Sequence, residues 1–251
     1  MYNFFANSGS REGDSYVITG SDFNHIKNVL RMKVGEKLLI SDCGTSHLCA
    51  IADYTEEAVY VSVLEEGYND TELSTQIYLF QGLPKGDKLE LIIQKAVELG
   101  VYEIIPVEMS RSVVKIEEKK RKSKQERWQA IAESAAKQSK RNIIPRVREV
   151  ISYKQAMEIA KELEVFAVPY ENKDGMRSTS ECFSKIKMAK NVGILIGPEG
   201  GFDENEVELA MNANGHVISL GKRILRAETA AITAIGAVML YLEMNGEVAE
   251  E

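Results

Sequence analysis

Short runs of alternating hydrophobic and polar residues characterise the start of the chain. Residues 37–41 and 59–63 follow this period of two, and clusters of turn residues separate the runs. One helical pattern interrupts them, with Ser21 and Asp22 as the expected N-cap ahead of apolar residues at helical spacing. We therefore expect residues 1–71 to form a small β-rich domain with one helix.

The pattern changes after residue 71, where short apolar segments alternate with longer segments of helical periodicity. Strands are expected at residues 76–83, 103–107, 165–169, 192–196 and 216–220, and helices at residues 87–99, 123–141, 153–163, 203–213 and 228–244. Repeated β-α-β order with short apolar strands is typical of a parallel sheet covered by helices on both faces. The sequence thus predicts an α/β domain over residues 72–251.

Composition excludes several classes of protein. Of the 251 residues 44% are hydrophobic and 27% charged, proportions that exclude a disordered, collagenous or coiled-coil protein. The longest strongly apolar stretch, residues 230–242, is shorter than the roughly 20 residues that a membrane span needs. The first residues do not resemble a signal peptide, and the cysteines show no disulfide pattern. We expect a cytoplasmic protein without a membrane partner.

Charge is distributed unevenly along the chain, which changes the meaning of its formal net charge of −7. Residues 110–148 contain thirteen Lys or Arg and four Glu, so this segment carries +9 and the remainder −16. Local positive potential can bind a polyanion even when the whole chain is acidic. The same residues could form the solvated face of a long helix, and charge alone leaves both interpretations open.

Three expected strands end in segments that could carry chemistry, because ligands of open α/β sheets bind at the carboxyl ends of the strands. These segments are residues 167–172, 194–202 and 219–230. In the second, Gly197, Gly200 and Gly201 allow a ligand to approach the backbone closely. Glu199 disfavours a bound pyrophosphate, and the segment matches neither a phosphate-binding loop nor a dinucleotide fingerprint. A tight β-α turn is the alternative.

The third segment places Arg223, Arg226 and Glu228 at the mouth of a helix that is apolar nearly all round. Charged groups at such a place cost free energy of desolvation unless they pair or meet a ligand. These charges therefore indicate either a ligand site or a structural ion pair between Arg226 and Glu228, and the sequence does not decide between the two.

The segments ILIGPEGGF (residues 194–202) and SLGKRILRAETA (residues 219–230) together resemble the C-terminal half of the SPOUT methyltransferases, specifically the ribosomal RNA small subunit methyltransferase E family. Further similarity lies upstream in the family's order. It comprises His25, Val29, Leu30, Arg31 and Gly35, residues 94–100 with Ile105 and Pro106, residues 111–114, and residues 133–141 with Pro145. Asn3 stands where the family usually has a basic residue, so we expect any RNA contact there to be weakened or replaced.

This resemblance implies an α/β fold of the SPOUT type, with a parallel sheet and a C-terminal trefoil knot, preceded by a small PUA-like β-barrel domain. It also implies a homodimer through the knot domain and S-adenosyl-L-methionine bound in the knot. An apolar adenine slot would be supplied by Leu195, Ile196, Leu220, Ile224 and Leu225, and a sulfonium cofactor tolerates Glu199 nearby. Cofactor contacts are expected at Val168, Leu195, Ile196, Gly197, Pro198, Gly200, Leu220, Gly221, Ile224, Leu225 and Ala230.

The implied reaction is methyl transfer to N3 of a uridine in small-subunit (16S) ribosomal RNA. A proton must leave N3, so catalysis needs alignment of N3 with the methyl group and stabilisation of negative charge on O2 and O4. Arg226 is the expected charge-stabilising residue, and Glu228 or Glu199 would orient it or accept the proton. The target base has to leave its stack to reach the site.

The RNA is expected to follow the basic residues toward the knot. Trp128 could stack on a base, although packing within its own domain is the stronger expectation. The predicted substrate contacts are Lys27, Arg31, Lys33, Arg111, Lys115, Lys137, Gln138 and Arg141.

Other chemistries are less well supported. Cys43, His47 and Cys49 are close in sequence but lack a fourth ligand at suitable spacing, so we expect no metal site. The rival functions are a non-catalytic RNA-binding protein, a nucleotide-dependent α/β enzyme, and a related knotted methyltransferase acting on transfer RNA or a ribose hydroxyl. A non-catalytic RNA-binding protein would not bind S-adenosylmethionine, so a binding measurement distinguishes it from a methyltransferase. The missing phosphate-loop lysine disfavours the nucleotide-dependent enzyme.

Overall fold

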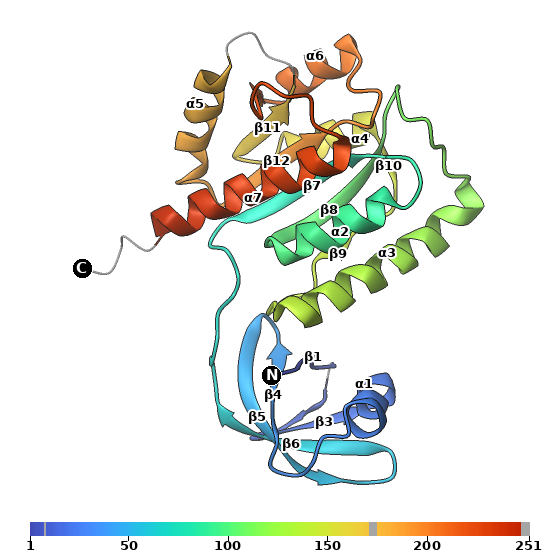
Figure 1. Cartoon of the computed structure of the whole chain (residues 1–251), viewed down its shortest axis with the longest axis vertical. Coiled ribbons are helices and arrows are strands. Elements are labelled where there is room, and N and C mark those ends of the chain that lie inside the picture. The colour runs from blue at the N-terminus through green and yellow to red at the C-terminus, as the bar shows by residue number, and fades with distance from the viewer. Residues whose placement is uncertain (8, 171–174, 247–251) are drawn as a thin grey trace. The chain divides into compact units, whose positions relative to one another are not determined.

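A computed structural model of the chain describes residues 1–7, 9–170 and 175–246 (Figure 1). The chain divides into two compact units. The first contains Met1–Glu72 and Ala136–Ile144, and the second contains Leu73–Ala135 and Pro145–Glu251. The short segment 136–144 thus belongs with the N-terminal residues, although the sequence places it inside the α/β region.

The first unit is built on a six-stranded sheet with the order β1-β4-β5-β6-β3-β2. All its strand pairs are antiparallel except β1 with β4. One face of the sheet buries an apolar core that includes Tyr16, Leu38, Ile51 and Val61. The strands are β1 Asn3–Phe5, β2 Arg11–Glu12, β3 Ser15–Thr19, β4 Lys37–Asp42, β5 Thr45–Tyr54 and β6 Ala58–Glu65.

The turn expected after residue 41 joins β4 to β5. Cys43 and Gly44 occupy its centre with φ angles of 48° and 86°. Two positive φ angles in succession match the right-handed twist of the flanking strands, which is why short hairpins favour them. The predicted turn is therefore confirmed.

The helical pattern in the first unit forms two short elements, α1 (Gly20–Asn24) and the π-helix η1 (His25–Val29). The expected cap is wrong, because the N-cap is Thr19 and its side chain makes no capping hydrogen bond. The carboxylate of Asp22 instead accepts a hydrogen bond from Lys137, with Nζ and Oδ1 2.9 Å apart. Asp22 therefore binds a residue distant in sequence and does not cap the helix as the local pattern predicted.

The second unit contains a seven-stranded sheet in which all pairs are parallel, with the order β10-β8-β7-β12-β11-β13 and β9 beside β8. This confirms the parallel sheet predicted from the apolar strands. The strands are β7 Gln76–Gly82, β8 Val101–Glu108, β9 Arg146–Val147, β10 Ile151–Ser152, β11 Val165–Pro169, β12 Asn191–Ile196 and β13 Gly215–Ile218.

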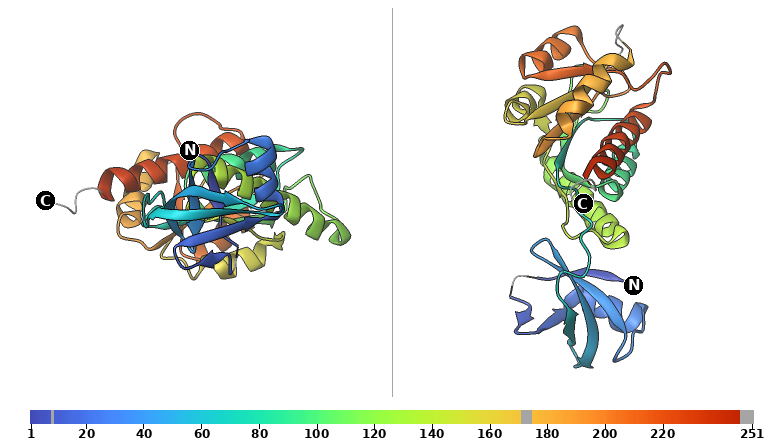
Figure 2. Two further views of the ribbon diagram at one scale, coloured as in Figure 1. Left: turned by 90° about the horizontal axis from the view of Figure 1, so that it is seen from below. Right: turned by 90° about the vertical axis from the view of Figure 1, so that its left-hand side faces the viewer.

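Helices cover both faces of this sheet. The helices that follow β7 along the chain are α2 Lys88–Glu98, α3 Glu118–Ser139, α4 Tyr153–Ala160, α5 Met176–Ile186, α6 Glu204–Asn212 and α7 Ala227–Gly246. α4 and α6 pack on the face that carries Phe80 and Phe166, and α2 and α7 lie side by side on the other face (Figures 1 and 2). Sequence patterning did not predict α5, whose buried residues Thr179, Cys182 and Ile186 form a narrow and partly polar stripe.

The long basic helix α3 begins five residues before its expected start. It ends at Ser139, where Lys140 adopts a φ of 59° that a right-handed helix cannot continue. Trp128 is only 4% exposed, so its ring packs within the protein. The alternative of a base-stacking tryptophan is wrong.

The last helix is longer than its strongly apolar stretch. α7 has 20 residues and is long and apolar enough, by length and composition alone, to cross a membrane. This corrects the expectation that the segment is too short. Within the second unit, α7 buries Ala231, Ile235 and Val238 and packs on α2, β12 and β7.

Candidate functional site

The segments expected to carry chemistry end at one edge of the second unit's sheet. β12, β11 and β13 are adjacent and parallel, so their carboxyl ends point the same way. The loops after β12 (residues 197–203) and β13 (residues 219–226) leave from this edge. In the segment after β11, residues 171 and 172 lie outside the described residues.

Two glycines allow segments at this edge to pack closely. A Cβ atom on Gly200 would lie 2.8 Å from Cβ and 2.9 Å from the carbonyl oxygen of Arg111. A Cβ on Gly82 would lie 2.7 Å from Cδ of Pro198. Real side chains do not tolerate such distances, so the loop after β12 can lie against the ends of β7 and β8 only because these positions are glycine.

The loop after β13 is held by α5. The hydroxyl of Thr179 donates to the carbonyl of Ser219 at 2.8 Å and accepts from the Ser219 amide at 3.0 Å. Gly221 follows with a φ of 107°, a conformation that glycine adopts without strain. Thr179 belongs to the helix that sequence patterning missed, so its role was not predicted.

A lysine joins the two loops. Lys88 Nζ lies 2.9 Å from Oε1 of Glu199, in the loop after β12, and 3.3 Å from Oε2 of Glu228, in the first turn of α7. Glu199 also accepts hydrogen bonds from the backbone amide of Lys85 at 3.1 and 3.3 Å. Sequence reasoning missed Lys88. Its place just after a strand end was the only available signal.

These contacts shift the pKa of Lys88 and the pKa of Glu199. The hydrogen bond to Glu199 raises the pKa of Lys88 above its usual value and outweighs the effect of desolvation. Partial burial acts to raise the pKa of Glu199, but hydrogen bonds from Lys88 and backbone amides outweigh it and hold that pKa below its usual value. Glu199 is therefore a weak proton acceptor at neutral pH.

Arg226 lies on the exposed surface of the loop after β13. No carboxylate of residues 1–7, 9–170 and 175–246 forms an ion pair with it. Glu228 faces Lys88, so the structural Arg226–Glu228 pair considered from the sequence is not formed. The guanidinium is left available to a ligand.

The expected cofactor residues fall into two groups. The side chains of Val168, Leu195 and Ile196 are at most 2% exposed and belong to the core beneath the loops, so they do not line an open slot. This corrects the expectation that Leu195 and Ile196 form its apolar wall. The others lie in or beside the two loops: Gly197, Pro198, Gly200, Leu220, Gly221, Ile224, Leu225 and Ala230.

The RNA contact predicted at Arg141 is wrong because that side chain is buried, and the contact predicted at the partly exposed Lys137 stays a prediction. Arg141 is 3% exposed, and its guanidinium forms an ion pair with Glu72, with Nε 2.8 Å from Oε1. Lys137 is bound to Asp22, as described above. The remaining predicted contacts are exposed: Lys27, Arg31, Lys33, Arg111, Lys115 and Gln138.

Asn3, which replaces the family's basic residue, is also buried. Its Nδ2 donates to the carbonyl of Arg141 at 3.0 Å, and its Oδ1 accepts from the Ser41 hydroxyl at 3.1 Å. The amide thus fixes β1 to the segment that follows α3 within the first unit.

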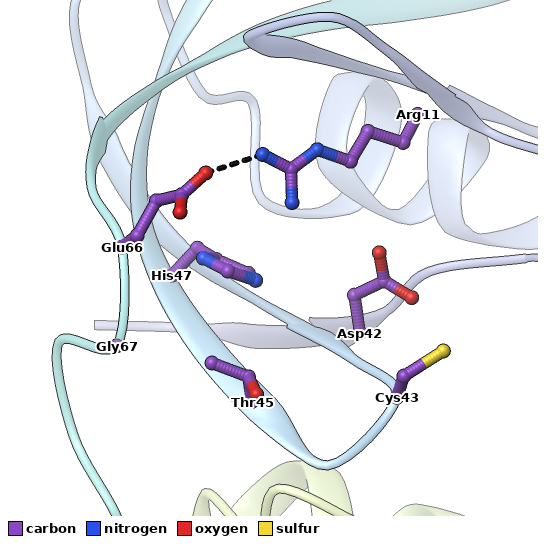
Figure 3. A pocket seen from close by; sticks show the side chains of 7 residues that line it. All are labelled: Arg11, Asp42, Cys43, Thr45, His47, Glu66 and Gly67. Carbon is purple, nitrogen blue, oxygen red and sulfur yellow. Dashed lines mark hydrogen bonds and ion pairs between the residues drawn. The ribbon is translucent and has the colours of Figure 1, made fainter.

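The first unit contains a pocket of about 540 Å³ (Figure 3). Arg11 and Glu66 form an ion pair across it, and the Tyr16 hydroxyl donates to Asp42 at 3.0 Å. The hydrogen bond to Asp42 raises the pKa of Cys43, and burial raises the pKa of Cys49 to about 12. Both shifts disfavour the thiolate, which is the form that binds a metal. In the part of the chain that the structure describes, no three His, Cys, Asp or Glu side chains form a metal-binding group.

Comparison with known proteins shows which family the chain belongs to. An RNA methyltransferase domain matches residues 71–239, and an RNA methyltransferase PUA domain matches residues 18–64. Ribosomal RNA small subunit methyltransferase E of Bacillus subtilis (strain 168) is 40% identical over 237 residues, 93% of each chain. The chain belongs to the ribosomal RNA small subunit methyltransferase E family.

Two more members of the methyltransferase E family are similar over nearly their full length. The Mesomycoplasma hyopneumoniae (strain 232) protein is 34% identical over 232 residues, 92% of this chain and 96% of its own. The crystal structure of the Neisseria gonorrhoeae protein, bound to S-adenosyl methionine, is 30% identical with a TM-score of 0.80, over 94% of this chain and 96% of that chain. The family, the PUA domain and the α/β fold class are confirmed.

Proposed function

We propose that this chain transfers a methyl group from S-adenosylmethionine to N3 of a uridine in small-subunit ribosomal RNA. The observation that carries the proposal is the exposed Arg226, which has no carboxylate partner in the described part of the chain and lies at the sheet edge from which two glycine-containing loops leave. The choice of small-subunit ribosomal RNA as substrate is supported by the names of the relatives. The choice of cofactor is supported by the S-adenosyl methionine bound to the Neisseria gonorrhoeae protein.

The residues at this edge suit the cofactor. Gly200 and Gly221 are at least partly exposed and carry no side chain, so a ligand can approach their backbone amides and carbonyls, and the partly exposed Leu220 and Leu225 offer apolar surface. A site of this composition can hold an adenosyl group through backbone hydrogen bonds and apolar contacts. When bound, S-adenosylmethionine supplies an electrophilic methyl group on its sulfonium.

The protein's contribution to catalysis is electrostatic and positional. N3 of the uridine gives up its proton as it becomes a nucleophile, and negative charge spreads onto O2 and O4 of the base. Arg226 donates hydrogen bonds to these oxygens and stabilises that charge. Glu199 and Glu228 are both bound to Lys88, so we do not propose that they orient Arg226. Nor do we propose that they accept the N3 proton, which is released to solvent.

The test of this assignment is Arg226→Ala. Loss of one charge-stabilising donor lowers kcat by about 100-fold or more, because its interaction is made mainly in the transition state. Equilibrium dialysis with labelled S-adenosylmethionine should show unchanged Kd. Lys222→Ala, which removes one exposed charge from the same loop, is the matched control. Turnover of Arg226→Ala near the wild-type rate would refute the assignment.

The modified atom is found by mass spectrometry of ribosomal RNA from cells with and without the gene. Loss of a 3-methyluridine from small-subunit RNA supports the proposal. Loss of a ribose methyl group, or of a mark on transfer RNA alone, identifies the related knotted enzymes instead. Normal modification together with failure to bind S-adenosylmethionine leaves a non-catalytic RNA-binding protein.

We further propose that the two domains of the chain are residues 1–71 and 72–251, with the segment Ala136–Ile144 of the second packing in the first compact unit. We also propose the trefoil knot, a homodimer through the knot domain and a cytoplasmic location. Support for the knot is the position of β11 between β12 and β13, which requires the chain to cross back after β12. Support for the homodimer is the exposed apolar surface of Ile224, Leu240 and Met244, which association would bury. Sedimentation equilibrium measures the mass of the particle and so tests the dimer.

A further inference from the structure

Lys88 connects three elements at the proposed active site. It is the first residue of α2, and its ammonium lies between Glu199 and Glu228. The side chains of the two glutamates are 25% and 16% exposed, so water screens their charges less than it would at the surface. A single positive charge therefore offsets two negative charges, at distances at which the Coulomb interaction is strong.

The two carboxylates do not depend on Lys88 equally. Glu199 has a second partner in the backbone amide of Lys85, which any substitution at Lys88 leaves in place. For Glu228, Lys88 is the ion-pair partner that the described residues provide. Loss of the ammonium would therefore release Glu228 in particular.

A released Glu228 has a cation close by along the chain. Arg226 is two residues away, directly before the first residue of the same helix. A carboxylate without a counter-charge at a partly buried site favours the nearest cation, since an unpaired buried charge is costly. An Arg226–Glu228 pair of this kind would oppose the stabilisation of negative charge on the uridine.

We propose that Lys88 is a positioning residue that binds the carboxylates of Glu228 and Glu199 and thereby keeps the positive charge of Arg226 available to the substrate. The proposal rests on the function proposed above for Arg226. Lys88 itself touches neither substrate nor cofactor in this scheme, and its effect on the rate passes through Glu228.

The first experiment compares single variants of the full chain. Lys88→Met should lower kcat for methylation of ribosomal RNA by about 10-fold, which corresponds to a modest loss of transition-state stabilisation. Lys88→Arg, which keeps the charge, should stay within about 3-fold of the wild type, since a guanidinium can also bind both carboxylates. Lys85→Met is the matched control, because it removes a neighbouring charge and keeps the amide that binds Glu199.

The decisive variant is the double substitution Lys88→Met/Glu228→Gln. Removal of the released carboxylate should restore at least about half of the lost activation free energy, the behaviour of coupled residues in a double-mutant cycle. A purely structural role of Lys88 predicts that kcat and the melting temperature fall and recover together, whereas the positioning role predicts a loss and recovery of kcat in variants whose melting temperatures match the wild type. A double variant as slow as Lys88→Met, or slower, overturns the proposal, as does wild-type kcat in Lys88→Met.

Two measurements keep the result interpretable. Melting temperatures identify a variant that does not fold, and if Lys88→Met is one, Lys88→Gln replaces it in both the single and the double variant. Wild-type protein that neither binds labelled S-adenosylmethionine nor methylates RNA refutes the proposed function. Normal wild-type activity with no effect at Lys88 refutes the positioning role alone.

Discussion

Arg141 and Arg226 have the same side chain but opposite surroundings. Arg226 is exposed and has no carboxylate partner among the described residues. Arg141 is buried against Glu72, which also accepts the amide of Asn142 at 2.8 Å. At the residue scale, burial and partner therefore decide which arginine can meet a substrate and which one holds the first unit together.

Arg141→Met should destabilise the protein, because it leaves the carboxylate of Glu72 without its counter-charge at a largely buried site. Removal of one partner from such a pair typically costs about 3–5 kcal/mol of the free energy of unfolding. Urea denaturation followed by circular dichroism measures this loss. Lys140→Met is the control, since Lys140 is exposed and adjacent, and it should change stability little. Equal stability of the two variants would contradict the structural role of Arg141.

Helix α6 shows how one element fixes another near the candidate site. Asp203 is its N-cap, and its side chain accepts the amide of Asn205 at 3.1 Å. Glu206 is 4% exposed, completes the capping box and also accepts the amide of Ser110 at 2.7 Å. One carboxylate thus closes the start of α6 and holds the turn after β8 that precedes Arg111.

At the scale of this element, Glu206→Ala should cost more stability than Asp203→Ala. Loss of the cap alone costs about 1 kcal/mol. Glu206→Ala also leaves the Ser110 amide without its acceptor, which adds roughly 1–3 kcal/mol. Thermal and urea unfolding of both variants give the comparison, with Glu204→Ala, an exposed neighbour in the same turn, as the control. A larger effect of Asp203→Ala would refute the double role of Glu206.

Across the whole molecule, the basic segment 110–148 is less free than its +9 charge suggests. Several of its cations pair with carboxylates from the rest of the chain: Arg121 with Glu108, Arg127 with Glu90, Lys137 with Asp22, Arg141 with Glu72 and Arg148 with Glu103. Lys115, Lys122 and Lys124 are exposed and have no ion pair with any carboxylate that the structure describes. These three are among the cations of the segment that can meet phosphate groups.

Substitution of Lys115, Lys122 and Lys124 together by Met should weaken RNA binding and flatten its dependence on salt. Each lost phosphate contact reduces the slope of log K against log salt by about 1, so a decrease of up to about 3 is expected. Fluorescence anisotropy with a ribosomal RNA fragment at several KCl concentrations measures the slope. The control replaces Lys154, Lys187 and Lys190, which are exposed outside the segment. An unchanged slope in the first variant would contradict RNA binding by this segment.

Local sequence patterns determined much of the fold because they reflect local physics. The apolar segments that became β11 and β12 could form only buried strands, and their order with the helices required a parallel sheet. Gly200 and Gly221 marked the loops where backbone must approach closely or adopt a positive φ. α5 escaped prediction because its buried stripe mixes Thr179 and Cys182 with few apolar residues.

The partners of charged and large polar side chains were decided by the tertiary structure alone. Lys88 and Glu199 are separated by 111 residues, and Arg141 and Glu72 by 69. Nothing in the local pattern around Arg141 distinguishes it from an RNA-binding arginine. Nothing in the sequence around Lys88 predicts that it binds the carboxylates of Glu199 and Glu228. The sequence by itself determined the family, the parallel sheet and the loops of the candidate site. Only the packing of distant segments decided which charges remain free, because an ion pair depends on distance in space and not along the chain.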